Sequence, residues 1–281
     1  MELICGKDIS SEIRNQLKEN LAQEGLKPCL AVINVGDDKE NLLYIGLKEN
    51  AVDTLGGETR IASLPQNAAK EEVLNLINEL NHDQAVNGIL LQLPLPKELQ
   101  PYEQEFLSAI DPAKDVDGFH PVNMGRLVNG TPGFISCAAL ACMDISKRYK
   151  APLAGKKVLL IGDSFDLIRP LALMFIKESC QVSVAPQYKS ALMEGVDIAV
   201  IEAGGPHIVK ASGIKEGALL IDAGFYYDQN SLFGNVDKED LSKIDGHLLP
   251  VPGGVGPMLI TKLLENLCMA AGMSLPDKNT G

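Results

Sequence analysis

The chain has 281 residues, and at about 150 residues per domain this length favours two domains over one. Hydrophobic residues make up 46% and charged residues 22%, a globular balance that excludes a disordered or fibrous chain. With 25 basic and 37 acidic residues the net charge is −12, which argues against a nucleic-acid partner because phosphate backbones bind clustered cations.

Targeting and redox features predict a cytoplasmic protein. Residues 1–8 lack the basic and apolar regions of a secretory signal, and no apolar run approaches the ~20 residues that span a bilayer, so we expect no membrane partner. The six cysteines are scattered without a Cys-x-x-Cys pair, which is typical of buried thiols in a reducing compartment. The four histidines show no ligand spacing, and we therefore expect no metal.

The first half of the chain alternates helical and strand patterns. Apolar residues at every fourth position from Ile9 to Leu21 predict an amphipathic helix. The further predicted elements are helices over 41–55 and 69–80 and buried strands over 30–35, 60–64 and 88–93. Gly56 is predicted to end the helix over 41–55, whose apolar face carries Leu43, Leu47, Ala51 and Leu55. This alternation indicates a parallel sheet covered by helices.

The second half repeats the alternation. A strand over 158–161 runs into Gly162 and a helix to residue 177, and the later elements are strands over 181–184, 198–201 and 218–222 and a helix over 258–271. We expect an α/β protein with two α/β domains and a ligand cleft between them. The first domain covers 1–120 and is completed by the C-terminal helix in 258–281, and the second covers 121–257 with a Rossmann-like parallel sheet.

Three side chains of the first half suit a catalytic site. Tyr44 and Lys48 share one face of their predicted helix, so the lysine either transfers protons beside an aromatic ring or lies over the tyrosine at the surface. Gln92 follows a buried strand at the sheet edge where α/β proteins bind ligands, although it could instead bond to its own loop.

Two further segments carry polar or conformationally special residues. Asp115 and Asp117 are separated by one residue, so only one of them points into a cleft if the segment is extended; the alternative is a turn with solvated acids. Residues 252–257 contain two prolines and three glycines, which predicts a rigid loop whose backbone a flat ligand can approach closely.

Five motifs together resemble the bifunctional methylenetetrahydrofolate dehydrogenase/methenyltetrahydrofolate cyclohydrolase family. They occur in the family's order across nearly the whole chain: Tyr44-Ile-Gly-Leu-Lys48, Gly88-Ile-Leu-Leu-Gln-Leu-Pro-Leu-Pro96, Lys114-Asp-Val-Asp-Gly-Phe-His-Pro121, Asn123-Met-Gly-Arg-Leu127 and Pro250-Val-Pro-Gly-Gly-Val-Gly-Pro-Met258. The resemblance implies that Lys48 is the central catalytic group and that Gln92 and Asp117 place it and the folate. It also implies substrate contacts from Tyr44, Gly253, Gly254 and Pro257, and hydrolysis of 5,10-methenyl- to 10-formyltetrahydrofolate. One departure is Asn41, where the family usually has a serine.

The half that resembles a dinucleotide-binding domain departs further from the family. The resemblance implies NADP or NAD as cofactor and places Gly162, Asp163, Ser164 and Phe225 at its binding positions. Asp163 replaces a basic residue and Ile168 replaces a glycine. We expect Asp163 and Asp166 to cap the following helix, where a phosphate would otherwise bind, and Asp163 to repel a 2′-phosphate. NAD stays compatible because an acid can accept a bond from a ribose hydroxyl.

Three functions follow as hypotheses. The leading one is a cyclohydrolase in one-carbon folate metabolism whose dehydrogenase activity is weakened, NAD-dependent or lost. The alternatives are a fully bifunctional NADP-dependent dehydrogenase/cyclohydrolase and a non-catalytic folate-binding protein. Lys48 argues against the last of these because a pure binder has no need of it. The resemblance further implies a homodimer formed through the second domain.

Overall fold

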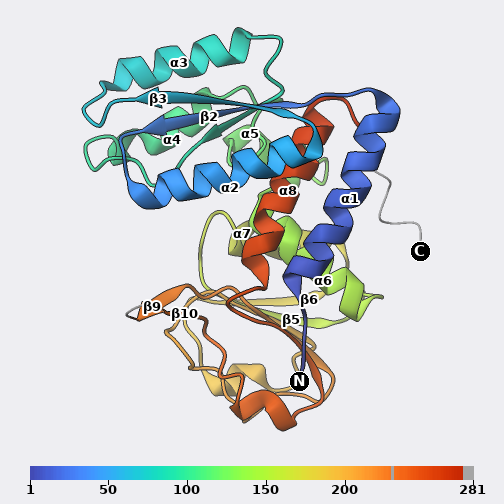
Figure 1. Cartoon of the computed structure of the whole chain (residues 1–281). Helices are drawn as coiled ribbons and strands as arrows, with labels where there is room; N and C mark the ends of the chain where they lie inside the picture. Colours follow the sequence, from blue (N-terminus) through green and yellow to red (C-terminus); the bar gives the residue numbers. More distant parts are fainter. Residues whose placement is uncertain (229–230, 275–281) are drawn as a thin grey trace. The chain divides into compact units, whose positions relative to one another are not determined.

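The computed structural model describes residues 1–228 and 231–274, and the last part of the segment 258–281 lies outside these ranges. The chain divides into two compact units. The three-stranded unit comprises Glu12–Ile135 and the residues from Leu263 on, and the six-stranded unit comprises Met1–Ser11 and Ser136–Lys262. The division falls inside two long helices, α1 (Gly6–Glu24) and α8 (Val255–Ala270), so each unit is assembled from two separate stretches of sequence (Figure 1).

The three-stranded unit is built on a parallel sheet with the strand order β3-β2-β4. Its strands are β2 (Cys29–Val35), β3 (Glu58–Leu64) and β4 (Gly88–Leu91). The helices of this unit are α2 (Lys39–Leu55), α3 (Lys70–His82), α4 (Glu103–Ala109) and α5 (Pro121–Val128), with a 3-10 turn over Gln100–Tyr102. The central strand β2 is buried along its whole length, as expected for a parallel strand covered on both faces.

Alternate side chains of β2 form the core of this unit. Ala31 and Ile33 pack in one cluster with Val73 and Ile77 of α3 and with Phe106 of α4. This confirms the predicted helix over 69–80, whose apolar side chains face the sheet. The predicted apolar face of α2 is wrong in its first half, because the helix turns other side chains inward: the exposed positions are Leu43 (63%) and Leu47 (46%), and the buried ones are Asn41, Ile45, Ala51, Val52 and Leu55.

The six-stranded unit has a sheet with the strand order β1-β11-β8-β7-β5-β6, and every neighbouring pair is parallel. Its strands are β1 (Glu2–Leu3), β5 (Lys157–Ile161), β6 (Gln181–Ala185), β7 (Ile198–Ile201), β8 (Ala218–Asp222) and β11 (Gly246–Leu249). The remaining elements are α6 (Cys137–Lys150), α7 (Ile168–Lys177), the antiparallel pair β9 (Tyr226–Asp228) and β10 (Ser231–Phe233), and 3-10 turns over Ser190–Met193 and Asp240–Lys243. The predicted Rossmann-like parallel sheet is confirmed.

The strand order of this sheet reverses at β5. The chain passes from β5 to β6 on one side and then returns to β7 on the other side of β5. In open α/β sheets, ligands bind outside the carboxyl ends of the strands at such a reversal. The loops that follow β5 and β7 therefore flank the expected ligand position of the six-stranded unit.

Two element boundaries differ from prediction in ways that affect function. Strand β4 ends at Leu91, two residues early, so Gln92 lies in the loop at the sheet edge. Helix α7 begins only at Ile168, so residues 163–167 form a loop after Gly162 instead of a first helical turn.

Candidate active site

Lys48 and Gln92 meet at the carboxyl edge of the three-stranded sheet. Nζ of Lys48, on α2, donates a hydrogen bond of 2.9 Å to Oε1 of Gln92. Gln92 is buried, and its backbone N–H donates to the carbonyl of Ile33 on β2 at 2.9 Å. The side chain that accepts from Lys48 is therefore held by the sheet itself. The sequence analysis selected both residues, and the fold brings them into contact.

Asn41 fixes the orientation of the Gln92 amide. Nε2 of Gln92 donates to the carbonyl of Leu93 at 2.8 Å and to Oδ1 of Asn41 at 3.3 Å. Nδ2 of Asn41 in turn donates to the carbonyl of Pro94 at 3.0 Å. Because both N–H groups of the Gln92 amide are engaged, its oxygen is the atom that faces Lys48. Asn41, which the sequence analysis noted only as a departure from the family, is thus part of the site.

The start of α2 explains how Asn41 and Lys48 reach this edge. Asp38 caps the helix, and its Oδ1 accepts hydrogen bonds from the backbone N–H groups of Glu40 and Asn41, both at 3.0 Å. Tyr44 and Lys48 follow at four-residue spacing, so they lie on one side of α2. Both side chains are half-buried.

The two acids of the Lys114–Pro121 motif differ in their surroundings. Asp115 is buried and accepts hydrogen bonds from the backbone N–H groups of Phe119 (3.1 Å) and His120 (2.9 Å) and from Nδ2 of Asn123 (2.8 Å). Burial raises the pKa of Asp115, and these hydrogen bonds oppose that shift. Asp115 thus holds the loop together, whereas the side chain of Asp117 is only half-buried.

The glycines of the Pro250–Met258 motif lie in the six-stranded unit. Gly253 has a left-handed φ of 93°, and its carbonyl accepts a hydrogen bond of 3.0 Å from the N–H of Gly6 at the start of α1. A Cβ on Gly254 would lie 2.2 Å from the carbonyl oxygen of Pro250. The loop therefore needs Gly253 for its left-handed backbone conformation and Gly254 for its close packing. Pro257 belongs to the same unit, in the first turn of α8.

Ser164 organises the loop between β5 and α7. Gly162 directly follows β5 and has a φ of 138°. Oγ of Ser164 accepts hydrogen bonds from the N–H groups of Leu167 (3.3 Å) and Ile168 (3.2 Å). The expected capping by Asp163 and Asp166 is therefore wrong: the turn brings the Ser164 hydroxyl to the first amides of α7, and the backbone carbonyls of the two aspartates accept from Nε of Arg169 (3.1 Å) and Oγ of Ser136.

The sequence analysis missed Glu202, which contacts this loop. Glu202 directly follows β7 and is half-buried, and its Oε2 accepts a hydrogen bond of 2.6 Å from Oγ of Ser164. Burial raises the pKa of Glu202, the hydrogen bond from Ser164 opposes that shift, and the charges of Asp166 and Asp163 raise the pKa further. A polar residue directly after an apolar strand was the signal that selected Gln92, and the same signal marks Glu202.

Phe225 lies in the loop after β8. Its ring is 52% exposed and meets the ring of Tyr227 edge to face, with 5.2 Å between the centroids. The buried carboxylate of Asp222 holds the start of this loop by accepting hydrogen bonds from the backbone N–H groups of Gly224, Asn235 and Val236.

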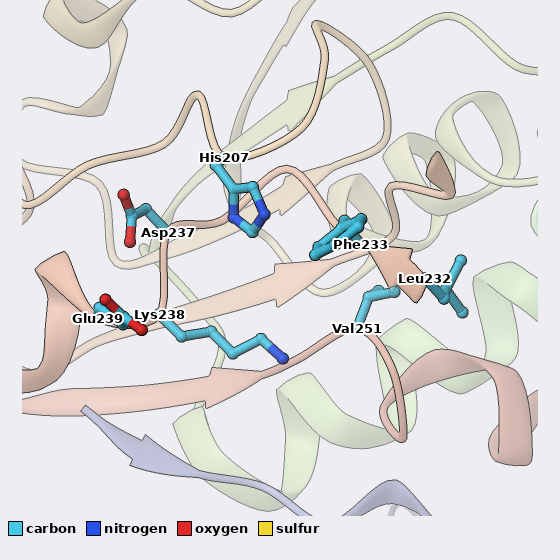
Figure 2. A pocket seen from close by; sticks show the side chains of 7 residues that line it. All are labelled: His207, Leu232, Phe233, Asp237, Lys238, Glu239 and Val251. Atoms are coloured by element: carbon cyan, nitrogen blue, oxygen red, sulfur yellow. The ribbon is translucent and has the colours of Figure 1, made fainter. Parts of the chain in front are cut away.

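A hollow of about 600 Å³ opens elsewhere in the six-stranded unit. His207 and Phe233 meet edge to face there, with 5.2 Å between their centroids, and Lys238 extends toward Val251 (Figure 2). Its lining is completed by Leu232, Asp237 and Glu239. None of the residues selected from the sequence lines this hollow.

The backbone at the reversal of the six-stranded sheet has the glycine that nicotinamide dinucleotide sites use for close approach of a pyrophosphate. This glycine, Gly162, is buried directly after β5, and the carboxylate of Glu202 lies against it. Within the described ranges, no group of three or more His, Cys, Asp and Glu side chains is arranged to hold a metal ion. Over the same residues, no helix combines the length and apolar character needed to cross a membrane.

Comparisons with known proteins match this architecture over nearly the whole chain. Residues 4–117 match the family model of the tetrahydrofolate dehydrogenase/cyclohydrolase catalytic domain, and residues 136–275 match that of the NAD(P)-binding domain of the same enzymes. Bifunctional protein FolD 1 of Syntrophomonas wolfei is 53% identical over 273 residues, which cover 96% of this chain and 99% of that protein.

Solved structures agree. The bifunctional FolD methylenetetrahydrofolate dehydrogenase/cyclohydrolase of Campylobacter jejuni superposes with a TM-score of 0.91 at 38% identity, covering 97% of this chain and 99% of that one. The Trypanosoma brucei enzyme, solved with NADP cofactor and an inhibitor, gives a TM-score of 0.87 at 30% identity, covering 96% and 97%.

The chain therefore belongs to the tetrahydrofolate dehydrogenase/cyclohydrolase family. It is an enzyme of one-carbon folate metabolism with an NAD(P)-binding type of second domain. The departures at Asp163 and Ile168 suggested a weakened or lost dehydrogenase activity. The comparisons do not support a loss of dehydrogenase activity. The match to the NAD(P)-binding domain model covers residues 136–275, which include the altered loop.

Proposed function

We propose that this enzyme catalyses both reactions of its family: oxidation of 5,10-methylenetetrahydrofolate and hydrolysis of the resulting 5,10-methenyl compound to 10-formyltetrahydrofolate. The observation that carries the proposal is the hydrogen bond between Nζ of Lys48 and Oε1 of Gln92 at the carboxyl edge of the sheet. This contact supports the proposal because an amine held at the edge where α/β sheets bind substrates is suited to proton transfer. A non-catalytic folate binder would not require it.

The hydrolytic step needs one group that can move protons. Water adds through its oxygen to the cationic methenyl carbon, and one of the two protons of that water is released to solvent. The second proton leaves the resulting hydroxyl as its oxygen becomes the formyl carbonyl, while N5 takes up a proton and the bond from N5 to this carbon breaks, which leaves the formyl group on N10. We assign the transfer of a proton from the hydroxyl to N5 to Lys48, with Gln92 holding its Nζ in position and Asp117 binding the amino and amide donors of the pterin. Tyr44 would pack against the aromatic parts of the folate.

The oxidative step requires a hydride acceptor, which a nicotinamide dinucleotide supplies when bound. Gly162, Asp163 and Ser164 would hold it at the sheet reversal, with Phe225 in the loop after β8. The resemblance to the family assigns substrate contacts to Gly253, Gly254 and Pro257. Asp163 favours NAD because an acid repels a 2′-phosphate, whereas the Trypanosoma brucei structure contains NADP. Both dinucleotides therefore belong in the assay.

Two rate measurements test the proposal. Hydrolysis of the methenyl substrate is followed for the wild type, Lys48→Ala and the control Lys39→Ala, which removes an exposed lysine from the same helix. Lys48→Ala should lose about 100-fold or more in rate, and the control should not change. Wild-type rates in Lys48→Ala would refute the assigned role. Oxidation of the methylene substrate is followed with NAD and with NADP. If neither dinucleotide supports oxidation, the dehydrogenase half of the proposal is refuted and only the cyclohydrolase activity stands.

The same proposal includes a homodimer in the cytoplasm. Strand β6 is an edge of the six-stranded sheet, and exposed apolar side chains lie on it and on α7: Val184 (52%) and Ile176 (59%). An exposed apolar sheet edge is suited to pairing with a second chain. All six cysteines are free thiols, as expected in a reducing compartment.

A further inference from the structure

The hydrogen bond between Ser164 and Glu202 crosses the reversal point of the six-stranded sheet. Ser164 belongs to the loop after β5, and Glu202 directly follows β7, the strand beside β5. The 2.6 Å bond between their side chains joins the two loops that flank the expected position of a dinucleotide. The bond therefore lies at the position where open α/β sheets normally bind their ligand.

The same contact occupies the groups that would bind a phosphate. The amides of Leu167 and Ile168, at the start of α7, already donate to Oγ of Ser164. A Cβ built on Gly162 would lie 3.0 Å from Oε2 of Glu202, so the carboxylate lies directly against the glycine corner. A phosphate approaching Gly162 must displace this carboxylate or share the corner with it.

The charges around Glu202 determine whether its carboxylate can stay beside a bound phosphate or must be displaced. The loop after β5 contributes Asp163, Asp166 and the exposed cation Arg169, whose Nε bonds to the carbonyl of Asp163. Helix α6 contributes Cys142, whose pKa burial raises to about 12, so it faces Glu202 as a neutral thiol. An ionised Glu202 thus adds a third negative charge to those of Asp163 and Asp166. This charge opposes the binding of a dinucleotide, whose pyrophosphate carries two negative charges.

We propose that Glu202 is the residue that controls dinucleotide binding in this enzyme. The dinucleotide binds when the Glu202 carboxyl is neutral and its bond with Ser164 is released, so binding takes up one proton. The neutral carboxyl can donate a hydrogen bond to a phosphate oxygen, which the ionised form cannot do. This inference rests on the proposed dehydrogenase function, since it concerns the same corner.

Direct binding of NAD tests the inference. NAD is the probe because its pyrophosphate does not titrate near neutral pH. Calorimetric titration is carried out between pH 5.5 and 8.5 on the full-length wild type, on Glu202→Gln, and on the control Glu194→Gln, which removes an exposed acid from the same unit. Wild-type affinity should fall by up to about tenfold per pH unit at the alkaline end. Glu202→Gln should bind at least about tenfold more tightly at pH 8, with little pH dependence.

Proton counting adds a second readout. Titrations in two buffers with different ionisation enthalpies should show uptake of close to one proton for the wild type and the Glu194→Gln control, and none for Glu202→Gln. Glu202→Ala serves as a second variant if Glu202→Gln folds poorly, and it should also bind NAD more tightly than the wild type at pH 8.

Two failures are distinguishable. Equal and pH-independent binding of NAD by the wild type and Glu202→Gln would overturn the role of Glu202 and leave the dehydrogenase proposal standing. Absence of NAD binding in every variant at every pH, with methenyl hydrolysis intact, would overturn the dehydrogenase proposal and the inference together.

Discussion

Nζ of Lys48 lies 2.9 Å from Oε1 of Gln92, and both N–H groups of that glutamine are committed to Leu93 and Asn41. The lysine therefore meets an acceptor that cannot turn its N–H side toward it. A buried amide with a single allowed orientation is a means of positioning a flexible side chain.

Gln92→Ala should lower kcat for methenyl hydrolysis by about 100-fold, because Lys48 loses the acceptor that positions it. KM should change much less, since the folate contacts assigned to Tyr44 and Asp117 remain. Gln100→Ala is the matched control, because it removes an exposed glutamine from the same unit. Steady-state kinetics on the three proteins provide the check, and an unchanged kcat in Gln92→Ala would contradict the positioning role.

Asn41→Ala should lower the free energy of unfolding by about 1–3 kcal/mol, because the buried carbonyl of Pro94 and the amide of Gln92 each lose a partner. Asn41→Ser should recover part of both stability and hydrolysis, since a hydroxyl can donate and accept. Urea denaturation measures the first quantity. The role of Asn41 would be refuted by an alanine variant as stable and as active as the wild type.

Glu202 should make stability depend on pH in a defined direction. Burial and the charges of Asp166 and Asp163 raise its pKa above that of an unfolded glutamate. Its contribution is therefore fully favourable below the ordinary carboxyl range and is lost as pH rises through the raised value. Glu202→Gln should melt about 2–4 °C above the wild type at pH 8 and show a smaller difference at pH 5. A larger gain at the lower pH would reverse the assigned sign.

The buried ion pair between Lys262 of α8 and Asp144 of α6 gives a stability prediction within the six-stranded unit. Nζ of Lys262 contacts Oδ2 of Asp144, and both residues are buried. Asp144→Ala should cost about 3–5 kcal/mol, because the buried lysine charge loses the Asp144 carboxylate. Replacing both residues, as Asp144→Leu with Lys262→Met, should recover most of this loss. Denaturant titrations measure both, and a double variant as unstable as the single one would contradict the pairing argument.

Val184→Lys should weaken the proposed homodimer. The side chain lies on the edge strand β6, where a charge opposes pairing with a second copy. Sedimentation velocity should show a shift from dimer toward monomer, while Val122→Lys, at an exposed valine of the three-stranded unit, should not alter the distribution. Identical profiles for Val184→Lys and the wild type would place the interface elsewhere.

Much of the fold could be predicted because buried parallel strands are continuous apolar runs, as in β2, β5 and β7. The strands β1 and β11 escaped prediction because the first has only two residues and the second lies in a segment with no clear apolar pattern. Leu43 and Leu47 show a further limit, since a helical stripe of leucines does not reveal which part of it meets the core.

The candidate site likewise contains some residues that could be predicted from the sequence and others that could not. Lys48 could be selected because it shares a helix face with Tyr44 and belongs to a family motif. Gln92 could be selected because it follows a buried strand at the sheet edge. The contact of Ser164 with Glu202 could not, because it joins residues 38 positions apart through a strand order that the sequence does not state. Capping of α7 was assigned to Asp163 and Asp166 on charge alone, whereas the turn geometry selected Ser164.

The pairing of β1 with β11 determines when the six-stranded sheet can form during synthesis of the chain. The first strand, Glu2–Leu3, pairs with His247 and Leu248 of β11, and the amino group of Met1 donates to the carbonyl of Leu241. During synthesis the six-stranded sheet therefore cannot be completed until most of the polypeptide has left the ribosome. Contacts this distant in sequence also slow folding. Removal of Glu2 and Leu3 therefore takes away β1 and its pairing with β11.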